Sequence, residues 1–536
     1  MVGFSNCTFL KAISKKNSSQ CKKTLKNQFQ SLSNNQQKYG VNNQMENTNG
    51  TRGRVRYFVA LMCSMISSMY FVHRIILSTA IVAMVKHKNL EENHYRNYST
   101  DSCPITSGSH NETDVFIEGE LDWSSELQGY VLGAGFLGCI ITQLPGGTFA
   151  EKWGAKRTLV IANILAAICT FITPMATWWN VYAVIFVQFL RGLTQGVNIP
   201  VTFVLMSNWF PRQERGFLST LVLSGYAFGA AIAGVPTGLL CDVPQLGWPS
   251  AFYSGGVFAA IMSLLFAFTV YETPASHPTI SQEELKYITE GQECDLSLAR
   301  PPTPWKKILT SEPVYALVVG LFGQYWQVTY FLSVHPTYMG TILHFSMTKN
   351  GAASNIPISI KSVGGIIASF LTNWITKKKY VGVSALRKSF NFVGSLGFSA
   401  CLLGAYWAGC DKLINIFCFT LSLFCSGAAL SGAMITGGDM SPRFCGSLMG
   451  FATTIASTSA AIIPVMVGNL TENQTIEEWQ IVFFISIAIV LSCGLIFNIF
   501  GSAEIQPWND PESQDKLKAM EKEFELENSK SSVTRF

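Results

Sequence analysis

Long apolar stretches, separated by short polar ones, fill most of the chain between residues 57 and 501. An α-helix rises about 1.5 Å per residue, so roughly 20 mostly apolar residues are needed to cross a hydrocarbon layer about 30 Å thick. Twelve stretches reach this length, and they lie near residues 57–85, 125–149, 158–178, 180–206, 216–241, 248–271, 313–340, 350–376, 385–408, 411–437, 443–468 and 478–501. The pattern therefore predicts an all-α membrane protein with 12 transmembrane helices.

The composition agrees with a membrane protein and excludes several other classes. Charged residues make up 13% of the 536 residues, whereas soluble proteins carry about 25%. The hydrophobic content of 48% excludes a chain that is disordered throughout. A net charge of +5 is too small to indicate a nucleic-acid partner. The lipid bilayer is the expected environment.

Positive charge is distributed unequally over the polar connections. Residues 1–56 carry ten Lys and Arg against one acidic residue, and further positive clusters follow the second, fourth, sixth, eighth and tenth predicted helices. Because cytoplasmic connections are enriched in Lys and Arg, both termini are predicted to be cytoplasmic. The opposite connections carry N-glycosylation sequons, which need a lumenal or extracellular face. These sequons begin at Asn97, Asn111, Asn469 and Asn473.

The long connection of residues 272–312 divides the predicted helices into two groups of six. Within it, Ser281-Gln-Glu-Glu284 has the pattern of a capping box and predicts a short helix. The predicted organisation is a disordered N-terminal tail (1–56), a first half (57–271) with an outer loop (86–123), a cytoplasmic central loop (272–312), a second half (313–501) and a C-terminal tail (502–536). Two six-helix halves of similar size are the layout of the major facilitator fold.

The connection after the second predicted helix carries a more specific pattern. It reads Gly147-x3-Glu151-Lys152-x-Gly154-x-Lys156-Arg157. This resembles the loop motif of the major facilitator superfamily, in which glycine permits a tight turn and the charges tie helix ends together at the cytoplasmic face. The resemblance implies that these residues take part in gating. Asp439, near the cytoplasmic end of the tenth predicted helix, is a further gating candidate. The alternative is a connection that merely follows the positive-inside rule.

Further motifs narrow the resemblance to one group of that superfamily. They are Ile140-Ile-Thr-Gln-Leu-Pro-Gly-Gly147, Arg74-x2-Leu-Ser-x-Ala-Ile-Val-Ala-Met84, Trp209-x-Pro-x3-Glu-Arg215, Asp439-Met-Ser-Pro442 and Gly501-x2-Glu-x-Gln-Pro-Trp508. All resemble segments of the anion:cation symporters, solute carrier family 17, which include sialin-type carriers, vesicular glutamate transporters and sodium–phosphate cotransporters. The resemblance implies secondary transport of organic or inorganic anions by alternating access, in the plasma membrane or in lysosomal or vesicular membranes.

Ionisable side chains inside the predicted helices are few and mostly cationic. A charge at the bilayer centre costs at least about 2.5 kcal/mol, so each is a functional candidate. Arg74 in the first half and Lys361 in the second would favour a small anionic substrate between the halves. Tyr330 and Tyr338 are candidates for aromatic contacts with it. For Lys361 the alternative is that its side chain extends along its stem to a membrane interface.

The fourth predicted helix differs from the usual pattern of the resembled group at two positions. Gln188, Arg191 and Gln195 share one helix face and are expected to line the transport path. In the resembled group, the positions of the two glutamines are usually an arginine that binds anions and a glutamate associated with proton coupling. Glutamine cannot titrate, so a proton relay through this helix would be broken.

The coupling mechanism therefore stays open between Na⁺, H⁺ and the membrane potential. His73 and His335 are coupling candidates, with hydrogen-bonded packing residues as the alternative. The loss of two charged groups in the fourth helix also keeps a second function open, that of a non-transporting, transporter-derived anion sensor or interaction protein.

The sequence indicates neither an enzyme nor a metal or cofactor site. It contains no Ser/His/Asp arrangement, no paired carboxylates and no zinc-like cysteine spacing. Cys103, Cys241 and Cys410 lie near the outer face, but no spacing selects a disulfide between them.

Overall fold

The computed structural model describes residues 55–85, 103, 120–243, 245–292, 302–343, 347–471 and 475–510. These residues are almost entirely helical, and their one β-type contact is an isolated bridge between Val85 and Leu121. The predicted N-terminal tail and the sequons at Asn97, Asn111 and Asn473 lie outside the described residues.

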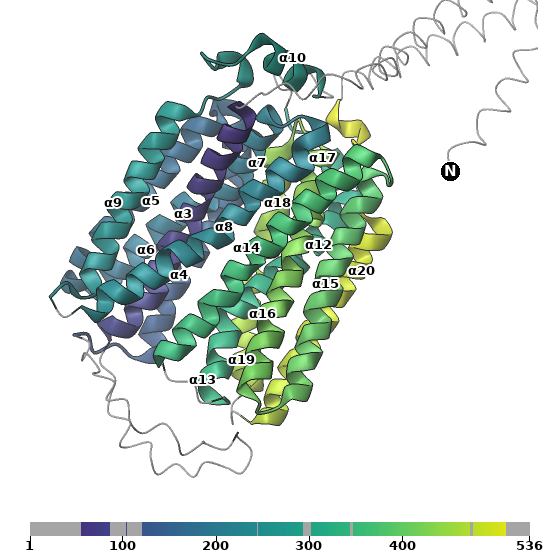
Figure 1. Cartoon of the computed structure of the whole chain (residues 1–536). Helices are drawn as coiled ribbons and strands as arrows, with labels where there is room; N and C mark the ends of the chain where they lie inside the picture. Colours follow the sequence, from purple (N-terminus) through teal and green to yellow (C-terminus); the bar gives the residue numbers. More distant parts are fainter. Residues whose placement is uncertain are drawn as a thin grey trace, which may run out of the picture. The chain divides into compact units, whose positions relative to one another are not determined.

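Two sets of helices make up the described part of the chain (Figure 1). The first helix set is α3 (Val55–Met84), α4 (Ser125–Trp153), α5 (Ala155–Trp179), α6 (Val181–Gly196), α7 (Asn198–Trp209), α8 (Arg212–Asp242) and α9 (Gly247–Thr269). The second helix set is α12 (Glu312–Thr329), the π-helix η3 (Tyr330–Val334), α13 (His335–Thr341), α14 (Met347–Lys378), α15 (Val383–Ala408), α16 (Lys412–Ala428), η4 (Ala429–Ser431), α17 (Ala433–Met440), α18 (Cys445–Ser457), α19 (Ser459–Leu470) and α20 (Ile476–Phe500). Short elements between or after the sets are η2 (Pro274–Ser276), α10 (Gln282–Glu290), α11 (Trp305–Ile308) and η5 (Pro507–Asn509).

In the part of the chain that the structure describes, ten helical stretches are long and apolar enough to cross a membrane. The two other predicted stretches, 180–206 and 313–340, are interrupted. The break between α6 and α7 falls at Val197, and Pro200 explains it, because a proline ring clashes with the carbonyl four residues earlier, that of Gly196. Likewise, the π-helix η3 comes just before Pro336, where the regular helical hydrogen bond is lost.

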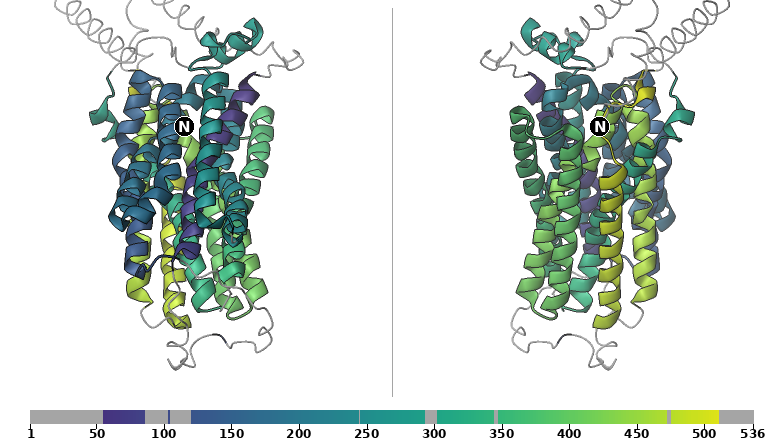
Figure 2. Two further views of the ribbon diagram at one scale, coloured as in Figure 1. Left: turned by 90° about the vertical axis from the view of Figure 1, so that its left-hand side faces the viewer. Right: turned by 90° about the vertical axis from the view of Figure 1, so that its right-hand side faces the viewer.

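Contacts within each set are extensive, and several helix pairs join the sets. In the first set α3 packs along α8, α4 along α6 and α5 along α9, while in the second α15 packs along α16 and α12 along α20. Between the sets, α4 and α7 contact α18, and α8 contacts α14. Figure 2 shows the sets from two further sides.

The small helix α10 is fixed to one end of the first helix set, called here the α10 end. Its predicted N-cap is confirmed, since the Ser281 hydroxyl accepts a hydrogen bond from the Glu284 backbone (3.2 Å). Glu284 also accepts a bond from the Arg56 backbone (3.1 Å), and Arg56 pairs with Glu214 at 2.7 Å. The guanidinium of Arg56 lies 4.9 Å from the Tyr287 ring centre. Burial raises the pKa of Tyr287 to about 12, so this ring stays neutral beneath the cation.

The segment after α20 also packs at the α10 end, against the second helix set. The backbone of Gln506 donates to the Met440 carbonyl (3.0 Å). The side-chain oxygen of Asn509 accepts from the Ser441 hydroxyl (2.9 Å) and from the Arg443 backbone (3.1 Å). Asn509 and Trp508 are buried. This segment therefore holds the turn between α17 and α18 in place.

A disulfide marks the opposite end, called here the disulfide end. It joins Cys103, in the connection between α3 and α4, to Cys410, in the turn between α15 and α16. The sequence left this pairing open, because 307 residues separate the two cysteines. Cys241, the third candidate, is buried and takes no part in this disulfide.

Candidate functional site

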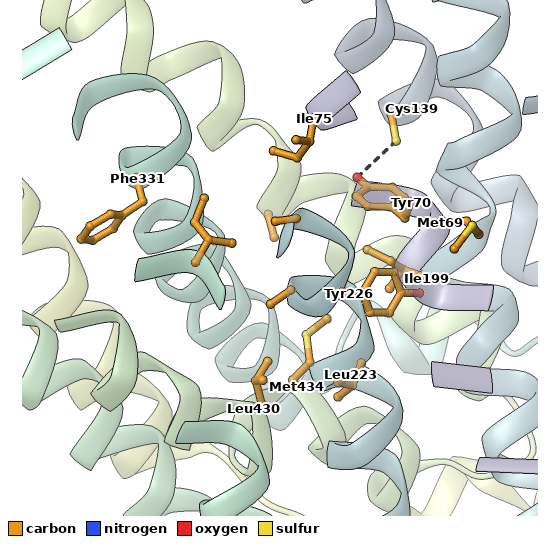
Figure 3. Packing of buried hydrophobic residues seen from close by; sticks show 14 of the residues in the cluster. Met69, Tyr70, Ile75, Cys139, Ile199, Leu223, Tyr226, Phe331, Leu430 and Met434 are labelled. Atoms are coloured by element: carbon orange, nitrogen blue, oxygen red, sulfur yellow. Dashed lines mark hydrogen bonds between the residues drawn. The ribbon is translucent and has the colours of Figure 1, made fainter. Parts of the chain in front are cut away.

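A cavity of about 120 Å³ lies between the two helix sets. Figure 3 shows part of its surroundings, including Tyr70, Ile199, Leu223, Tyr226, Leu430 and Met434. The first set contributes Tyr70, Phe71, Arg74, Phe136, Cys139, Ile140, Ile199, Leu223, Tyr226 and Ala227, and the second contributes Gln324, Tyr325, Val328, Thr329, Leu332, Ile358, Lys361, Leu430, Met434, Ser457 and Ala460. The walls are thus mainly aliphatic and aromatic, with few charged groups.

Arg74 supplies the cation of the first wall. It is half-buried on α3, and its guanidinium carbon lies 4.1 Å from the ring centre of Phe136 and 4.8 Å from that of Tyr70. Such contacts stabilise a guanidinium while leaving its N–H edge free to donate. None of the ion pairs between described residues includes Arg74.

Lys361 supplies the cation of the second wall. It is buried on α14 and lines the same cavity. No described carboxylate forms an ion pair with it. A buried ammonium without a partner is costly, and an anion entering the cavity would supply that partner. The structure therefore brings Arg74 and Lys361, 287 positions apart in the sequence (361 − 74), to opposite sides of one cavity.

The three polar residues of α6 occupy a different place from these cations. They are buried inside the first helix set and do not line the cavity. Gln188 donates to the Thr173 hydroxyl (3.1 Å), Arg191 to the His73 carbonyl (2.6 Å) and Gln195 to the Tyr70 carbonyl (3.3 Å). In this structure they attach α6 to α5 and α3, and through the last two bonds they hold the turn of α3 that ends at Arg74.

The two histidines lie away from the cavity lining. The Nδ1 atom of His73 is 2.8 Å from the Thr170 hydroxyl, within the first set. His335 is enclosed by aromatic rings, with Phe419 at 4.6 Å and Phe331 at 5.1 Å between ring centres. No described residue forms a hydrogen bond with either ring nitrogen of His335.

Tyr330 and Tyr338 belong to the same aromatic cluster as His335. Tyr338 lies 5.1 Å from Phe483 and 5.3 Å from Trp479, and Tyr330 lies 6.2 Å from Phe398. Neither tyrosine lines the cavity in this structure. Its aromatic walls come instead from Tyr70, Phe71, Phe136, Tyr226 and Tyr325, which the sequence pattern did not single out.

Several polar residues that the sequence pattern did not single out hold the cavity walls in place. Tyr226 donates to Asn198 (2.8 Å), at the start of α7, and Asn198 donates to Asn163 (3.4 Å). Gln324 donates to Asn391 and to the Ala429 carbonyl, both at 2.9 Å. Asparagines inside predicted transmembrane stretches were the available signal, since buried amides need partners.

A close contact between the sets lies between the cavity and the α10 end. Gly147 of α4 touches Gly446 of α18 so closely that a Cβ atom on Gly147 would collide with the Gly446 carbonyl. One turn further along α4, Glu151 accepts hydrogen bonds from the Ser447 backbone (2.8 Å) and hydroxyl (2.5 Å). Nearer the cavity, the Ser457 hydroxyl donates to Gln143 (3.0 Å). The sets are therefore joined from the cavity to the α10 end along this pair of helices.

The rest of the motif around Glu151 shapes the turn after α4. Gly154 has φ = +103°, a conformation that favours glycine. Glu272 accepts bonds from the backbones of Ala155 (2.6 Å) and Lys156 (2.8 Å), where it caps α5. The Lys156 ammonium lies 4.8 Å from the Tyr271 ring centre. Lys152 and Arg157 are exposed.

Asp439 forms a second connection between the sets at the α10 end. Its carboxylate pairs with Arg387 at 2.9 Å within the second set and with Arg215 of the first set at 3.8 Å. All three side chains are buried. Arg215 also donates to the Gly438 carbonyl (3.2 Å). In the sequence, Arg215 and Arg387 belong to two separate clusters of positive charge. Nothing local indicates that both contact Asp439, because the three residues are far apart along the chain.

Of the four predicted glycosylation sites, the structure describes Asn469. It is exposed at the end of α19. This end of α19 lies at the disulfide end (Figure 1).

Comparison with known proteins shows what this chain is similar to. The model of the "Major Facilitator Superfamily" matches residues 58–437. A Drosophila melanogaster protein named "Putative inorganic phosphate cotransporter" is 33% identical over 475 residues, which cover 87% of this chain and 88% of that protein. Vesicular glutamate transporter 2 of Homo sapiens is 34% identical over 473 residues, covering 86% and 77%. Sialin of Homo sapiens is 32% identical over 458 residues, covering 84% and 90%.

Solved structures agree in fold. A proton:xylose symporter bound to 6-bromo-6-deoxy-D-glucose matches with a TM-score of 0.60 and 15% identity, covering 83% of this chain and 95% of that chain. The fucose:proton symporter of E. coli matches with a TM-score of 0.55 and 14% identity, covering 82% and 98%.

Proposed function

Since the chain belongs to the major facilitator superfamily, in the anion:cation symporter group of solute carrier family 17, we propose that it carries small organic or inorganic anions across a membrane by alternating access. The observation that carries this proposal is a pair of cations, Arg74 and Lys361, which lie on opposite walls of one cavity and form no ion pair with any described carboxylate. An anion between them would interact with both helix sets at once. Relatives named as a phosphate cotransporter, a glutamate transporter and sialin support the anionic class.

The protein is a multi-pass integral membrane protein, and we propose 12 spans in two six-helix halves. The ten spans that are long and apolar enough to cross a membrane, together with α6–α7 and α12–η3–α13, make 12 crossings. Residues 57–271 and 313–501 form the halves, with 272–312 as the central loop and 1–56 and 502–536 as cytoplasmic tails. The disulfide supports a cytoplasmic α10 end, because disulfides persist in extracellular and lumenal compartments. The plasma membrane and vesicular or lysosomal membranes are the two proposed locations.

Gating is proposed at the α10 end. Gly147, Glu151 and Asp439 make contacts that hold the halves together there, so these contacts must break when the cavity opens to the cytoplasm. Gly154, Lys152, Lys156 and Arg157 would shape and charge the adjoining turn.

Anion flux into proteoliposomes tests the proposal. We expect saturable uptake of at least one labelled anion, and Arg74→Ala or Lys361→Met to reduce its kcat/KM by about 10-fold to 100-fold, since a charged hydrogen bond contributes about 1.5–3 kcal/mol. Lys286→Ala, an exposed lysine on α10, is the matched control and should leave flux unchanged. Unchanged flux in Arg74→Ala would show that the site is wrongly assigned.

A second candidate function is an anion sensor without turnover. The amides of Gln188 and Gln195 favour it, because neither can titrate and both are committed to contacts within the first helix set. Saturable binding with no flux under imposed Na⁺, proton and potential gradients would select the sensor over the transporter.

A further inference from the structure

The cavity walls have a large apolar surface and few polar groups that could replace the water around a hydrated ligand. Apart from Arg74 and Lys361, none of the described residues that line it carries a charged side chain. Its aliphatic and aromatic lining includes Phe136, Leu223, Leu430 and Met434. Pockets of this kind bind ligands whose bodies are apolar, while a few polar groups fix the orientation.

Most polar side chains in the lining have already used their donors within the protein. Tyr226 donates to Asn198, and Ser457 donates to Gln143. The amide nitrogen of Gln324 donates to both Asn391 and Ala429. These three residues therefore have no spare N–H or O–H group for a ligand.

The donors that remain for a ligand lie mainly on three lining residues, Arg74, Lys361 and Tyr325. Arg74 and Lys361 have no carboxylate partner among the described residues, and the buried hydroxyl of Tyr325 has no hydrogen-bond partner there. A guanidinium, an ammonium and a phenol are sufficient for the two oxygens of a carboxylate.

An inorganic phosphate dianion fits these donors poorly. The dianion carries two negative charges and has oxygens on all sides, and all of them lose water when it enters the cavity. Burying such charge without a full set of hydrogen bonds has a high free-energy cost. Proteins usually meet this cost with helix N-termini or glycine-rich loops that direct several backbone N–H groups at the phosphate. The hydroxyl groups of an acidic sugar would lose their water against a mainly aliphatic and aromatic lining, where few polar groups can replace it.

Resting on the proposed transport function, we infer that the substrate class is an organic monoanion with one carboxylate on a compact apolar body. The carboxylate lies between Arg74 and Lys361, and the apolar body lies against the walls of Leu223, Leu430 and Met434 (Figure 3). The volume of about 120 Å³ suits a short alkyl chain or a single ring, since an apolar cavity of about 150 Å³ holds benzene. This class differs from the phosphate named for the Drosophila relative.

The test is a series of straight-chain carboxylates from acetate to hexanoate, compared with inorganic phosphate and N-acetylneuraminate. Binding to the purified full-length protein is measured by calorimetry, and flux is measured in proteoliposomes. We expect affinity to rise about fourfold per added methylene, the factor that burial of one CH₂ group gives, and to exceed the affinity for phosphate at every length beyond butanoate.

Met434→Gln is a nearly isosteric change in the apolar wall. It should weaken binding of hexanoate more than binding of acetate, so that affinity rises less steeply with chain length. Arg74→Ala should weaken every carboxylate.

The two measurements separate this inference from the transport proposal. A chain-length series in binding without flux supports the ligand class and overturns transport. Flux of phosphate, with carboxylate affinity independent of chain length, overturns the ligand class and leaves transport standing. Absence of carboxylate binding overturns the ligand class whatever the flux of other anions.

Discussion

Glu151 at the end of α4 caps the N-terminus of α18 in the opposite helix set, through both the backbone and the hydroxyl of Ser447. A carboxylate at a helix N-terminus satisfies otherwise unpaired N–H groups and is stabilised by the helix dipole. Because cap and helix belong to different sets, the bond exists only while the sets are together at the α10 end. The cap thus stabilises one of the two states that alternating access requires.

Replacing Glu151 by Gln should weaken the closed α10 end. Loss of the charge removes about 1–2 kcal/mol from the two bonds, which shifts the balance between states about 5-fold to 30-fold toward opening at this end. Apparent substrate affinities measured from the two sides of oriented vesicles report this shift. Lys306→Ala, an exposed lysine at the same end, is the control and should shift nothing. Equal affinities in E151Q and the unmodified protein would contradict a role for the cap.

The glycine contact gives a sharper test, because the chain offers a matched pair on one helix. Gly147→Ala places a Cβ against the Gly446 carbonyl and should abolish closure at the α10 end, reducing transport at least about 10-fold. Gly133→Ala, also on α4, meets nothing within 4 Å. It should leave transport intact and stabilise the helix by up to about 1 kcal/mol. Uptake and thermal unfolding of both variants are measured together, and normal uptake by G147A would show that this contact is dispensable.

Asp439→Asn should destabilise the protein strongly. It leaves Arg387 and Arg215 buried without their carboxylate, and breaking a buried pair costs about 3–5 kcal/mol. Asp510→Asn alters a half-exposed carboxylate that pairs with Arg443, where about 0–1 kcal/mol is expected. The midpoint of thermal unfolding in detergent should fall by several degrees in D439N and hardly at all in D510N. Similar midpoints would mean that the Asp439 pair contributes no more than a surface one.

Asn509→Ala should loosen the turn between α17 and α18. It removes the acceptor of Ser441 and of the Arg443 backbone, at a cost of about 1–3 kcal/mol for buried groups left unpaired. Hydrogen exchange of the Arg443 amide should accelerate. Glu504→Ala, exposed in the same segment, should not change it. Slow exchange in N509A would show that the segment after α20 does not hold this turn.

The disulfide predicts that the two helix sets stay covalently joined after the chain is cut between them. With a protease site inserted between residues 292 and 302, the cleaved protein should run as one species without reductant and as two with it. Cys103→Ser should give two fragments under both conditions. An impermeant reductant should act from the side opposite the termini, which checks the proposed orientation.

Most helix positions could be predicted from sequence, since a membrane demands long apolar stretches and few other signals imitate them. The breaks at Val197 and at η3 were missed, because Pro200 and Pro336 can also be accommodated in continuous transmembrane helices. Arg74 and Lys361 stood out because charge is rare in such segments. The direction in which each faces came only from the packing.

The rest of the site could not be read from a single chain. Gln188, Arg191 and Gln195 share a helix face, but that spacing is the same whether the face lines a cavity or packs against α3 and α5. Aromatic residues are 12% of the sequence, so nothing in the sequence distinguishes Phe136 and Tyr226, which line the cavity, from the other aromatic residues. The partners Cys103 and Cys410 are 307 residues apart, beyond the reach of any local pattern.

The touching backbones of Gly147 and Gly446 also bear on the evolutionary record of this interface. Side chains in contact can change together during evolution, and this covariation allows contacts to be inferred from aligned sequences. A position that only glycine can occupy does not vary, so it has nothing with which to covary. This close approach between the helix sets would therefore leave no covariation signal, and in a set of homologues it would have to be recognised as two invariant glycines.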